Sequence, residues 1–419
     1  MEENAQVAEL IETARAIEGM PRNASTHAAG VVITREPVSA YVPLAMNDDV
    51  VVTQYIMTTL EELGLLKMDF LGLRTLTVIH DAAEAAGIDM EQAPIDDPAV
   101  YRLFSQGRTE GIFQFESSGM KDMLQKLKPN RLEHLIAATS LYRPGPADQI
   151  DGYVACANNA QLVQYKTPLL KPILENTYGF MVYQEQVMQI FRSLAGYSYG
   201  QADVVRRAMS KKKAYVMEKE RANFVHGNAE EGVPGCEANG IAPEIAEHIY
   251  GTMMDFAKYA FNKSHAACYA VVAYQTAYLK YYYPVEFMAA LMTSVIDNPG
   301  KVSEYIYSCR QMGIKILPPD INKGEGSFSV DGGNIRYGLA AIKSIGKPVI
   351  ESIIQERKNG GEFSNLKDFI ERLSGKEVNK RTIESFIKSG AFDSLGGTRK
   401  QFMVVYVQIL DQVNRERKY

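Results

Sequence analysis

The spacing of apolar residues changes from helical to strand-like near the N-terminus. A helical period predicts a helix over residues 4–18, which Gly19 and Pro21 end. Short β-branched or aromatic runs then predict strands over residues 30–34, 40–44, 50–55 and 64–73. We therefore expect one helix and a small mixed sheet at this end of the chain.

A helical period dominates the centre of the chain, from about residue 75 to residue 298. Residues 327–330 and 334–338 then predict a hairpin, and two helix-turn-helix units follow around Gly346 and Gly390. Together these patterns predict a mainly α, multidomain α+β protein with a large helical domain.

Alternation in the strand over residues 64–73 places two charged side chains on one face. Leu66, Met68 and Phe70 fall on the opposite face from Lys67 and Asp69. A carboxylate beside a cation suits a site that holds a divalent metal ion and steadies a phosphate. An aspartate at a strand end that caps the following helix explains the same pattern.

The stretch from Gly196 to Lys213 predicts a helix that is crowded with cations. One face is apolar, while Arg206, Arg207 and Lys211 project from the rest, and five cations fall within eight residues. In an acidic chain this cluster is best explained by a polyanion that binds against it, such as a triphosphate or a nucleic-acid backbone. The alternative is a solvated helix face.

A second informative helix begins near residues 262–264 and ends before Pro284. His265 and Tyr269 are one turn apart and share a face near the positive end of the helix dipole. With Lys263 and Ser264 they could contact the phosphate, sugar and base of a nucleotide, although a histidine at a helix start also serves purely structural roles.

Two further segments have less specific patterns. Arg143 precedes Pro144, and this position favours an extended backbone that would hold the guanidinium rigidly. Gln184 and Met188 share a helix face, which we interpret as ordinary packing.

The C-terminal part combines glycine hairpins with an excess of cations. From Lys376 onward the chain has nine Lys or Arg against five Asp or Glu. A glycine hairpin can present backbone N–H groups to a phosphate without reading bases, so we predict DNA contacts at Lys343, Gly346 and Lys347. Plain packing of paired helices fits the spacing equally well.

Composition narrows the class of protein. The chain has 419 residues, of which 46% are hydrophobic and 23% charged, as in globular proteins with two to four domains. No apolar run approaches the roughly 18 residues that span a bilayer, and the acidic start predicts no signal peptide. The four cysteines lie too far apart for zinc or a disulfide framework, so we predict a cytoplasmic protein with no membrane partner. The net charge of −5 confines any nucleic-acid surface to a local patch.

Nine short segments, in this order, resemble the bacterial C-family replicative DNA polymerases, the group of the DNA polymerase III alpha subunits. The segments are STHAAGVVIT, LLKMDFLGLRTLT, GIFQFES, LYRPGP, YQEQVM, DVVRRAMSKKK, FNKSHAACYA, KILPPDIN and AIKSIG. The resemblance covers nearly the whole chain. It implies the end of a thumb at residues 1–20, the closing part of a nucleotidyltransferase-type palm at 21–75, fingers at 76–317, and a helix-hairpin-helix domain leading to the clamp-binding region at 318–419.

The resemblance also implies roles for particular residues. Asp69 matches the third metal-binding aspartate of the palm, and Lys67 the neighbouring cation. The residues matching those that grip the incoming triphosphate or surround the nascent base pair are Arg206, Arg207, Lys211, Arg143, Asn262, Lys263, Ser264, His265 and Tyr269. The implied cofactor is a pair of Mg²⁺ ions. The implied partners are template-primer DNA, dNTP, and, in the full-length protein, a sliding clamp and other replisome subunits.

The chain departs from the family pattern in two places that matter. It contains no Asp-x-Asp pair, which supplies two further palm aspartates in the family, and Ser344 stands where the hairpin usually has its first glycine. We therefore expect this chain alone to be inactive. Two alternatives are a non-catalytic helix-hairpin-helix DNA-binding protein and a phosphate-sensing enzyme unrelated to DNA.

Overall fold

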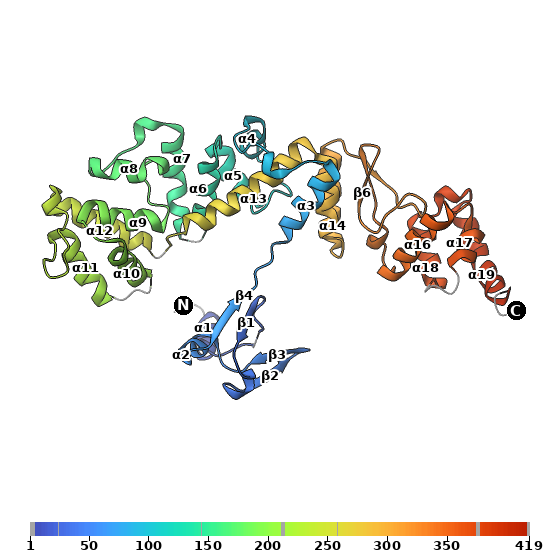
Figure 1. Cartoon of the computed structure of the whole chain (residues 1–419), viewed down its shortest axis with the longest axis horizontal. Coiled ribbons are helices and arrows are strands. Elements are labelled where there is room, and N and C mark those ends of the chain that lie inside the picture. The colour runs from blue at the N-terminus through green and yellow to red at the C-terminus, as the bar shows by residue number, and fades with distance from the viewer. Residues whose placement is uncertain are drawn as a thin grey trace. The chain divides into compact units, whose positions relative to one another are not determined.

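The computed structural model describes residues 5–23, 25–143, 145–210, 214–257, 259–373 and 378–416. The chain divides into two compact units, Met1–Leu73 and Arg74–Tyr419. Helices dominate the described residues, and the strands form small sheets, so the predicted multidomain α+β class is confirmed (Figure 1). Lys211 and Lys376 lie outside the described residues.

The N-terminal unit contains two separate antiparallel sheets. Its elements are α1 (Ala5–Ile17), β1 (Gly30–Ile33), β2 (Leu44–Asn47), β3 (Val50–Thr53), α2 (Met57–Glu62) and β4 (Leu66–Asp69). β1 pairs with β4 and β2 pairs with β3. The prediction of α1 is confirmed. The prediction of one mixed sheet at this end of the chain is wrong, because the strands form two separate antiparallel pairs.

The predicted strand over residues 40–44 is also wrong. Val38–Ala40 forms a 3-10 turn after Pro37, and β2 begins only at Leu44. Val42 is the reason for this difference, because its side chain is 2% exposed and anchors the turn rather than alternating along a strand.

The second unit begins with helices arranged around α13. These are α3 (Arg74–Ala86), α4 (Pro98–Ser105), α5 (Ser118–Leu127), α6 (Leu132–Leu141), α7 (Ile150–Asn158), α8 (Lys171–Leu174), α9 (Gln184–Ala195), α10 (Tyr199–Ser210), α11 (Ala214–His226), α12 (Pro243–Ala257), α13 (Lys263–Tyr282), α14 (Pro284–Ser294) and α15 (Pro299–Gln311). α13 has 20 residues and runs from the α9–α12 group towards α3 and α14 (Figure 1). The small buried residues Ala266, Ala270, Ala273 and Ala277 recur along one face and allow α6 to pack closely.

A mixed three-stranded sheet follows these helices. β6 (Ser329–Asp331) and β7 (Asn334–Arg336) form the predicted hairpin, and β5 (Ile316–Leu317) adds parallel to β7. Gly332 and Gly333 both have positive φ, 57° and 78°, which a two-residue hairpin turn requires.

The last four helices share one hydrophobic core. They are α16 (Lys347–Gly360), α17 (Leu366–Leu373), α18 (Lys380–Ser389) and α19 (Arg399–Glu416). The predicted unit around Gly390 is confirmed, since Gly390 ends α18 with a φ of 86°. Around Gly346 only the 3-10 turn Leu339–Ala341 precedes α16, so the first of the two expected helices is a single turn.

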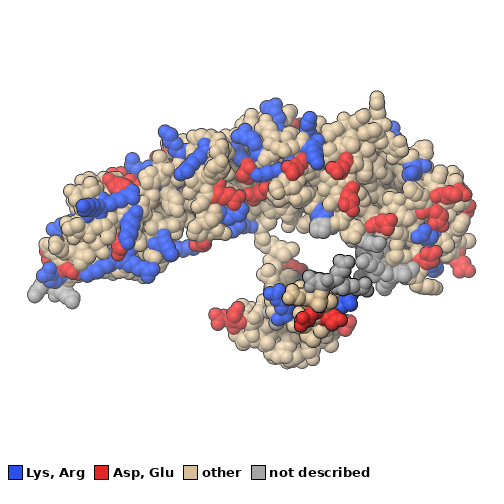
Figure 2. Space-filling view, turned by 180° about the vertical axis from the view of Figure 1, so that it is seen from behind, with Lys and Arg blue, Asp and Glu red and all other residues tan. Residues whose placement is uncertain are grey.

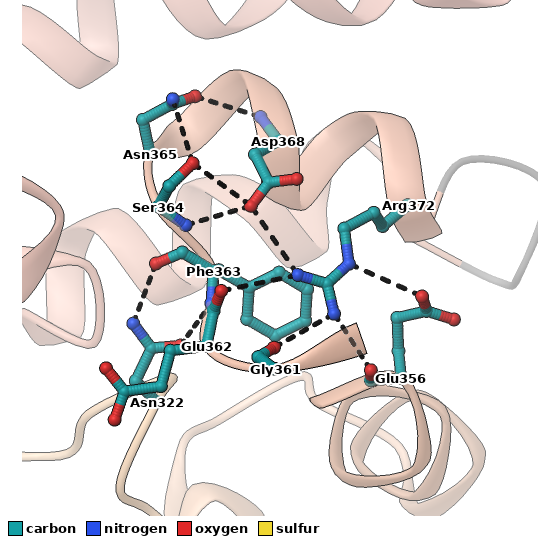
Figure 3. Close-up of polar contacts among 9 residues, drawn as sticks. All are labelled: Asn322, Glu356, Gly361, Glu362, Phe363, Ser364, Asn365, Asp368 and Arg372. Atoms are coloured by element: carbon teal, nitrogen blue, oxygen red, sulfur yellow. Dashed lines mark hydrogen bonds and ion pairs between the residues drawn. The ribbon is translucent and has the colours of Figure 1, made fainter. Parts of the chain in front are cut away.

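Arg372 fixes the connection between α16 and α17. Its guanidinium donates to the carbonyl oxygens of Glu356 (2.8 Å) and Gly361 (3.0 Å) and lies 4.3 Å from the centroid of the Phe363 ring (Figure 3). The carboxylates of Asp368 and Glu356 also form ion pairs with this guanidinium. Such a set of bonds uses the planar fork of arginine, which lysine lacks.

Among the described residues, no helix is long and apolar enough to cross a membrane.

Candidate functional site

Lys67 and Asp69 form an ion pair on one face of β4. The Lys67 Nζ lies 2.9 Å from the Asp69 Oδ1, and the predicted alternation is confirmed. This hydrogen bond from Lys67 lowers the pKa of the Asp69 carboxyl. The carboxylate is therefore ionised, and 41% of its side chain is exposed to receive a ligand.

The neighbouring strand makes room for this pair. Gly30 lies opposite Asp69 in the β1–β4 register. A Cβ at Gly30 would lie 2.6 Å from the Lys67 Cε and 2.8 Å from the His27 Nδ1, so a larger residue here would displace these two side chains. His27 accepts the backbone N–H groups of Ala29 and Gly30 through that nitrogen. Sequence reasoning did not single out His27 or Gly30.

The described residues do not fit a two-metal site by themselves. They contain no group of three or more His, Cys, Asp or Glu side chains that could hold a metal ion. Asp69 supplies one carboxylate, and a two-ion site needs ligands on both ions. The described residues therefore leave such a site incomplete.

The two arginines of α10 share one aspartate. The Nε and Nη2 atoms of Arg206 lie 3.0 and 2.7 Å from the Asp203 Oδ1, and Arg207 lies 2.7 Å from the other carboxylate oxygen. The bond from Arg206 holds the pKa of Asp203 below its usual range. The Arg206 side chain is only 21% exposed, whereas that of Arg207 is 69% exposed. The pair therefore presents one fixed and one accessible guanidinium.

The first turn of α9 connects α10 to the start of α13. Gln184 accepts a hydrogen bond from Arg206 at 2.9 Å through its side chain, and its backbone N–H donates to the Phe261 carbonyl oxygen. Glu185 accepts the backbone N–H of Lys263 at 3.0 and 3.1 Å. Gln184 thus does more than the packing that its sequence pattern indicated.

Asn262 caps α13, which begins where the sequence predicted a helix start. Its side-chain oxygen accepts the backbone N–H of His265 at 2.8 Å. Lys263 lies 5.4 Å above the Tyr183 ring, and both Lys263 and Ser264 are exposed. These residues therefore lie together at the N-terminal end of the helix, where its dipole favours an anion.

Aromatic rings form a ladder along the exposed side of α13. His265 and Tyr269 have centroids 4.2 Å apart, and Phe261 lies 5.4 Å from His265. The shared face of His265 and Tyr269 is confirmed. Arg143 stacks 4.3 Å from the Phe261 ring and donates to the Tyr259 carbonyl oxygen at 2.9 Å. Pro144, which was expected to hold Arg143 in position, lies outside the described residues.

Arg143 retains one unused donor. Its Nε is buried and has no hydrogen-bond partner among the described residues, and burial lowers the pKa of the guanidinium. A buried donor without a partner is costly unless a ligand or water supplies one. The structure thus brings Arg143, Arg206, Arg207, Lys263, His265 and Tyr269 into one network.

The predicted DNA contacts lie on the surface at the start of α16. Lys343, Gly346 and Lys347 are all exposed. Ser344 adopts a φ of 72°, the conformation that glycine favours, and its hydroxyl accepts a hydrogen bond from Arg381 at 3.0 Å. Figure 2 shows many Lys and Arg side chains over this C-terminal end of the molecule.

Sequence models of three protein domains match this chain. The "Bacterial DNA polymerase III alpha NTPase domain" matches residues 1–72, and the "Bacterial DNA polymerase III alpha subunit finger domain" matches residues 75–232. The "Helix-hairpin-helix motif" matches residues 313–402.

Curated proteins named DNA polymerase III subunit alpha are similar over almost the entire chain. The protein of Thermus aquaticus is 47% identical over 94% of this chain and 33% of its own length. Those of Bacillus subtilis and Chlamydia trachomatis are 43% and 42% identical, over 95% and 99% of this chain and 36% and 34% of their own lengths. The chain spans about a third of the length of these relatives. It belongs to the family of bacterial DNA polymerase III alpha subunits.

Proposed function

We propose that this chain binds the incoming dNTP and the template-primer within a replicative DNA-directed DNA polymerase that copies the chromosome. The observation that carries the proposal is the α9 turn, whose Gln184 and Glu185 join the arginines of α10 to the start of α13. This arrangement places cations beside a row of aromatic rings, which suits a nucleotide with a triphosphate and a base.

Each part of the network has a role in this proposal. Arg206 and Arg207 bind the triphosphate, with Lys211 as a further cation, and Arg143, which lies over the Phe261 ring, adds another guanidinium beside them. His265 and Tyr269 form the wall of the nascent base pair. Lys263 and Ser264 contact phosphate or sugar, while Asn262 holds the helix end in place.

The reaction of such a polymerase is a nucleotidyl transfer. The 3′-oxygen of the primer attacks the α-phosphate, a new phosphodiester bond forms, and pyrophosphate leaves with the electrons of the broken P–O bond. The contribution of this chain is to position the triphosphate and to stabilise its charge. Lys67 balances the charge of Asp69 until a cation or phosphate arrives.

Mg²⁺ is the proposed cofactor of the complete enzyme, where it would supply positive charge for the oxygens of the reacting phosphate. Asp69 would be one ligand. The described residues offer no group of three metal-ligating side chains, so they would hold only part of such a site.

The remaining assignments follow the same proposal. Residues 1–20, 21–75, 76–317 and 318–419 serve as the end of the thumb, the end of the palm, the fingers and the helix-hairpin-helix domain. Lys343, Gly346 and Lys347 bind duplex phosphates, and the full-length protein binds a sliding clamp and other replisome subunits in the cytoplasm. A non-catalytic DNA-binding protein would need only the C-terminal helices and would leave the α9 network unexplained.

A structure with bound nucleotide tests the proposal. Crystals of a full-length polymerase carrying this sequence, with primer-template and a non-hydrolysable dNTP, should show the triphosphate beside Arg206 and Arg207 and the base near His265. An α13 face that stays empty, with DNA bound only at the C-terminal helices, would favour the non-catalytic alternative.

A further inference from the structure

We infer that Phe113 and Gln114, at the tip of the loop between α4 and α5, position the templating nucleotide opposite the incoming dNTP. This inference rests on the proposed function. It adds the ring of Phe113 and the amide group of Gln114 to the row of aromatic rings at the start of α13. The argument has three parts: the loop is rigid, its tip is presented to the ladder, and its chemistry suits a base.

A buried lysine anchors the base of this loop. Lys280 of α13 is 5% exposed, and its Nζ donates to the carbonyl oxygens of Arg108 at 2.9 Å and Glu110 at 2.7 Å. Burying an ammonium group is costly, and the carbonyls and the Glu110 carboxylate compensate for the loss of water. The hydroxyl of Thr109 closes the loop by donating to the Phe115 carbonyl oxygen at 2.6 Å.

A second set of bonds holds the loop against α13 and α15. The backbone N–H of Phe113 donates to the Thr276 hydroxyl at 3.2 Å. Glu116 accepts the backbone N–H of Gly111 at 3.0 Å and the hydroxyl of Tyr305 at 3.3 Å. The tip is therefore fixed in position before any ligand arrives, which lowers the entropic cost of binding.

Phe113 continues the ladder beyond Tyr269. The centroids of these two rings are 5.2 Å apart, so Phe261, His265, Tyr269 and Phe113 form a row of four aromatic side chains. Rows of aromatic rings bind bases by stacking, and every base has a face that stacks. None of these four rings is fully buried.

Gln114 has the features of a contact residue rather than of a packing residue. Its φ is 62°, a left-handed conformation that costs free energy for any residue except glycine. Its side chain is exposed and has no hydrogen-bond partner among the described residues. The hydrogen bonds on either side hold the backbone in this conformation, and the free carboxamide can donate to and accept from a base edge or a sugar.

Charge separates the two ends of the ladder. Arg143, Lys263 and, through Gln184, Arg206 lie at the Phe261 end. At the Phe113 end, the ring and the neutral amide of Gln114 line a cavity together with Arg74 and Glu116, whose charges are of opposite sign. A dNTP with its triphosphate at the cationic end would place its base on the middle rings, and the template base would meet Phe113 and Gln114.

Substitutions in a full-length polymerase carrying this sequence test the inference. Gln114→Gly removes the amide and also relieves the strain, so it should not unfold the loop, while Phe113→Leu removes stacking and Phe113→Tyr keeps it. Lys128→Gly is the matched control, because Lys128 is also exposed with a left-handed φ of 51°. Single-turnover incorporation is measured opposite a normal base and opposite an abasic site.

Opposite a normal base, we expect Phe113→Leu and Gln114→Gly to lower kcat/KM for the dNTP by about 5-fold or more, the lower end of the usual loss on removing a base-stacking or base-contacting group. Opposite the abasic site both variants should match the parent, and Phe113→Tyr and Lys128→Gly should match it on both templates. Equal losses on the two templates, or no loss on either, would overturn the inference. Arg206→Ala tests the proposed function separately from this inference. If the proposed function is wrong, Arg206→Ala should incorporate the dNTP normally on both templates.

A spectroscopic measurement adds a readout that a structural role would not change. With 2-aminopurine as the templating base, its fluorescence in the ternary complex should rise in Phe113→Leu, since stacking on a ring quenches the probe. The same probe placed three pairs back in the duplex should be unaffected. An unchanged signal at the templating position would contradict the contact.

Discussion

The cations of the α10 region and those of the C-terminal helices are arranged in opposite ways. Arg206 is bonded to Asp203 and Gln184 and is mostly buried. Lys343 and Lys347 are exposed and form no ion pair or hydrogen bond within the part of the chain that the structure describes. Both surfaces attract anions, but only the first holds its charges at defined positions.

This difference separates two kinds of recognition. Fixed guanidinium groups favour one ligand geometry and lose little entropy on binding. Solvated lysines bind a phosphate backbone in many registers and release counterions when they do so. We therefore expect the α10 region to act on nucleotide kinetics and the C-terminal helices to act on DNA affinity.

The largest effect that we predict is a complete absence of primer extension by this 419-residue chain in Mg²⁺. With one of three expected carboxylates, the metal site cannot assemble. A radiolabelled primer-template with all four dNTPs measures this, and a gel-shift with the same DNA is the control for folded protein. Template-dependent products above background would show that Asp69 works without the missing pair.

The next effect concerns the arginines in a full-length polymerase carrying this sequence. Arg206→Ala or Arg207→Ala removes charge-assisted bonds worth roughly 1.5 to 3 kcal/mol, so kcat/KM for the dNTP should fall about 10- to 150-fold. Primer-template affinity should barely change. Single-nucleotide incorporation across dNTP concentration gives the first quantity, and fluorescence anisotropy gives the second.

Lys301→Ala is the control for this prediction. Lys301 also pairs with a carboxylate on its own helix, at 2.8 Å from Glu304, but lies in α15 outside the network. It should leave both quantities near the parent values. Near-normal kcat/KM in both arginine variants would contradict the proposal that Arg206 and Arg207 bind the triphosphate. A loss confined to DNA affinity would indicate that the two arginines bind the template instead.

The smallest effect concerns the lysines at the start of α16. Lys343→Ala or Lys347→Ala should weaken duplex binding to the same extent for every sequence and reduce the salt slope of log K by about 0.9 per phosphate contact. Lys367→Ala, whose lysine pairs with Glu371, is the control. An affinity for duplex DNA that does not change between low and moderate salt, or that is higher for one sequence, would contradict the prediction.

Local patterns predicted the local parts of this structure well. Alternation placed Lys67 and Asp69 on one face of β4, and Gly332 with Gly333 marked the hairpin turn. The start of α13 at Asn262 followed from its capping side chain. In each case the residues that determine the geometry lie within a few positions of one another, so their sequence spacing is enough.

The connections between distant segments could not be predicted in this way. Glu185 and Lys263 are separated by 78 positions, and no periodicity links them. Gln184 therefore looked like a packing residue, and Phe113 gave no sign that it stacks on Tyr269. Resemblance to a family suggested the candidate site that spacing alone left open, but not the contacts of the α9 turn with α10 and α13.

Asp203 places a carboxylate within the proposed triphosphate site. Its single negative charge pairs with both Arg206 and Arg207 and leaves one positive charge over, so a triphosphate would meet a partly neutralised site and would have to displace Asp203 from the guanidinium groups. A singly charged ion gains too little to compete with two salt bridges, whereas a polyphosphate carries enough charge to do so. When pyrophosphate departs, Asp203 can rebind both guanidinium groups, so the two arginines of the proposed site would be left with one unpaired positive charge rather than two.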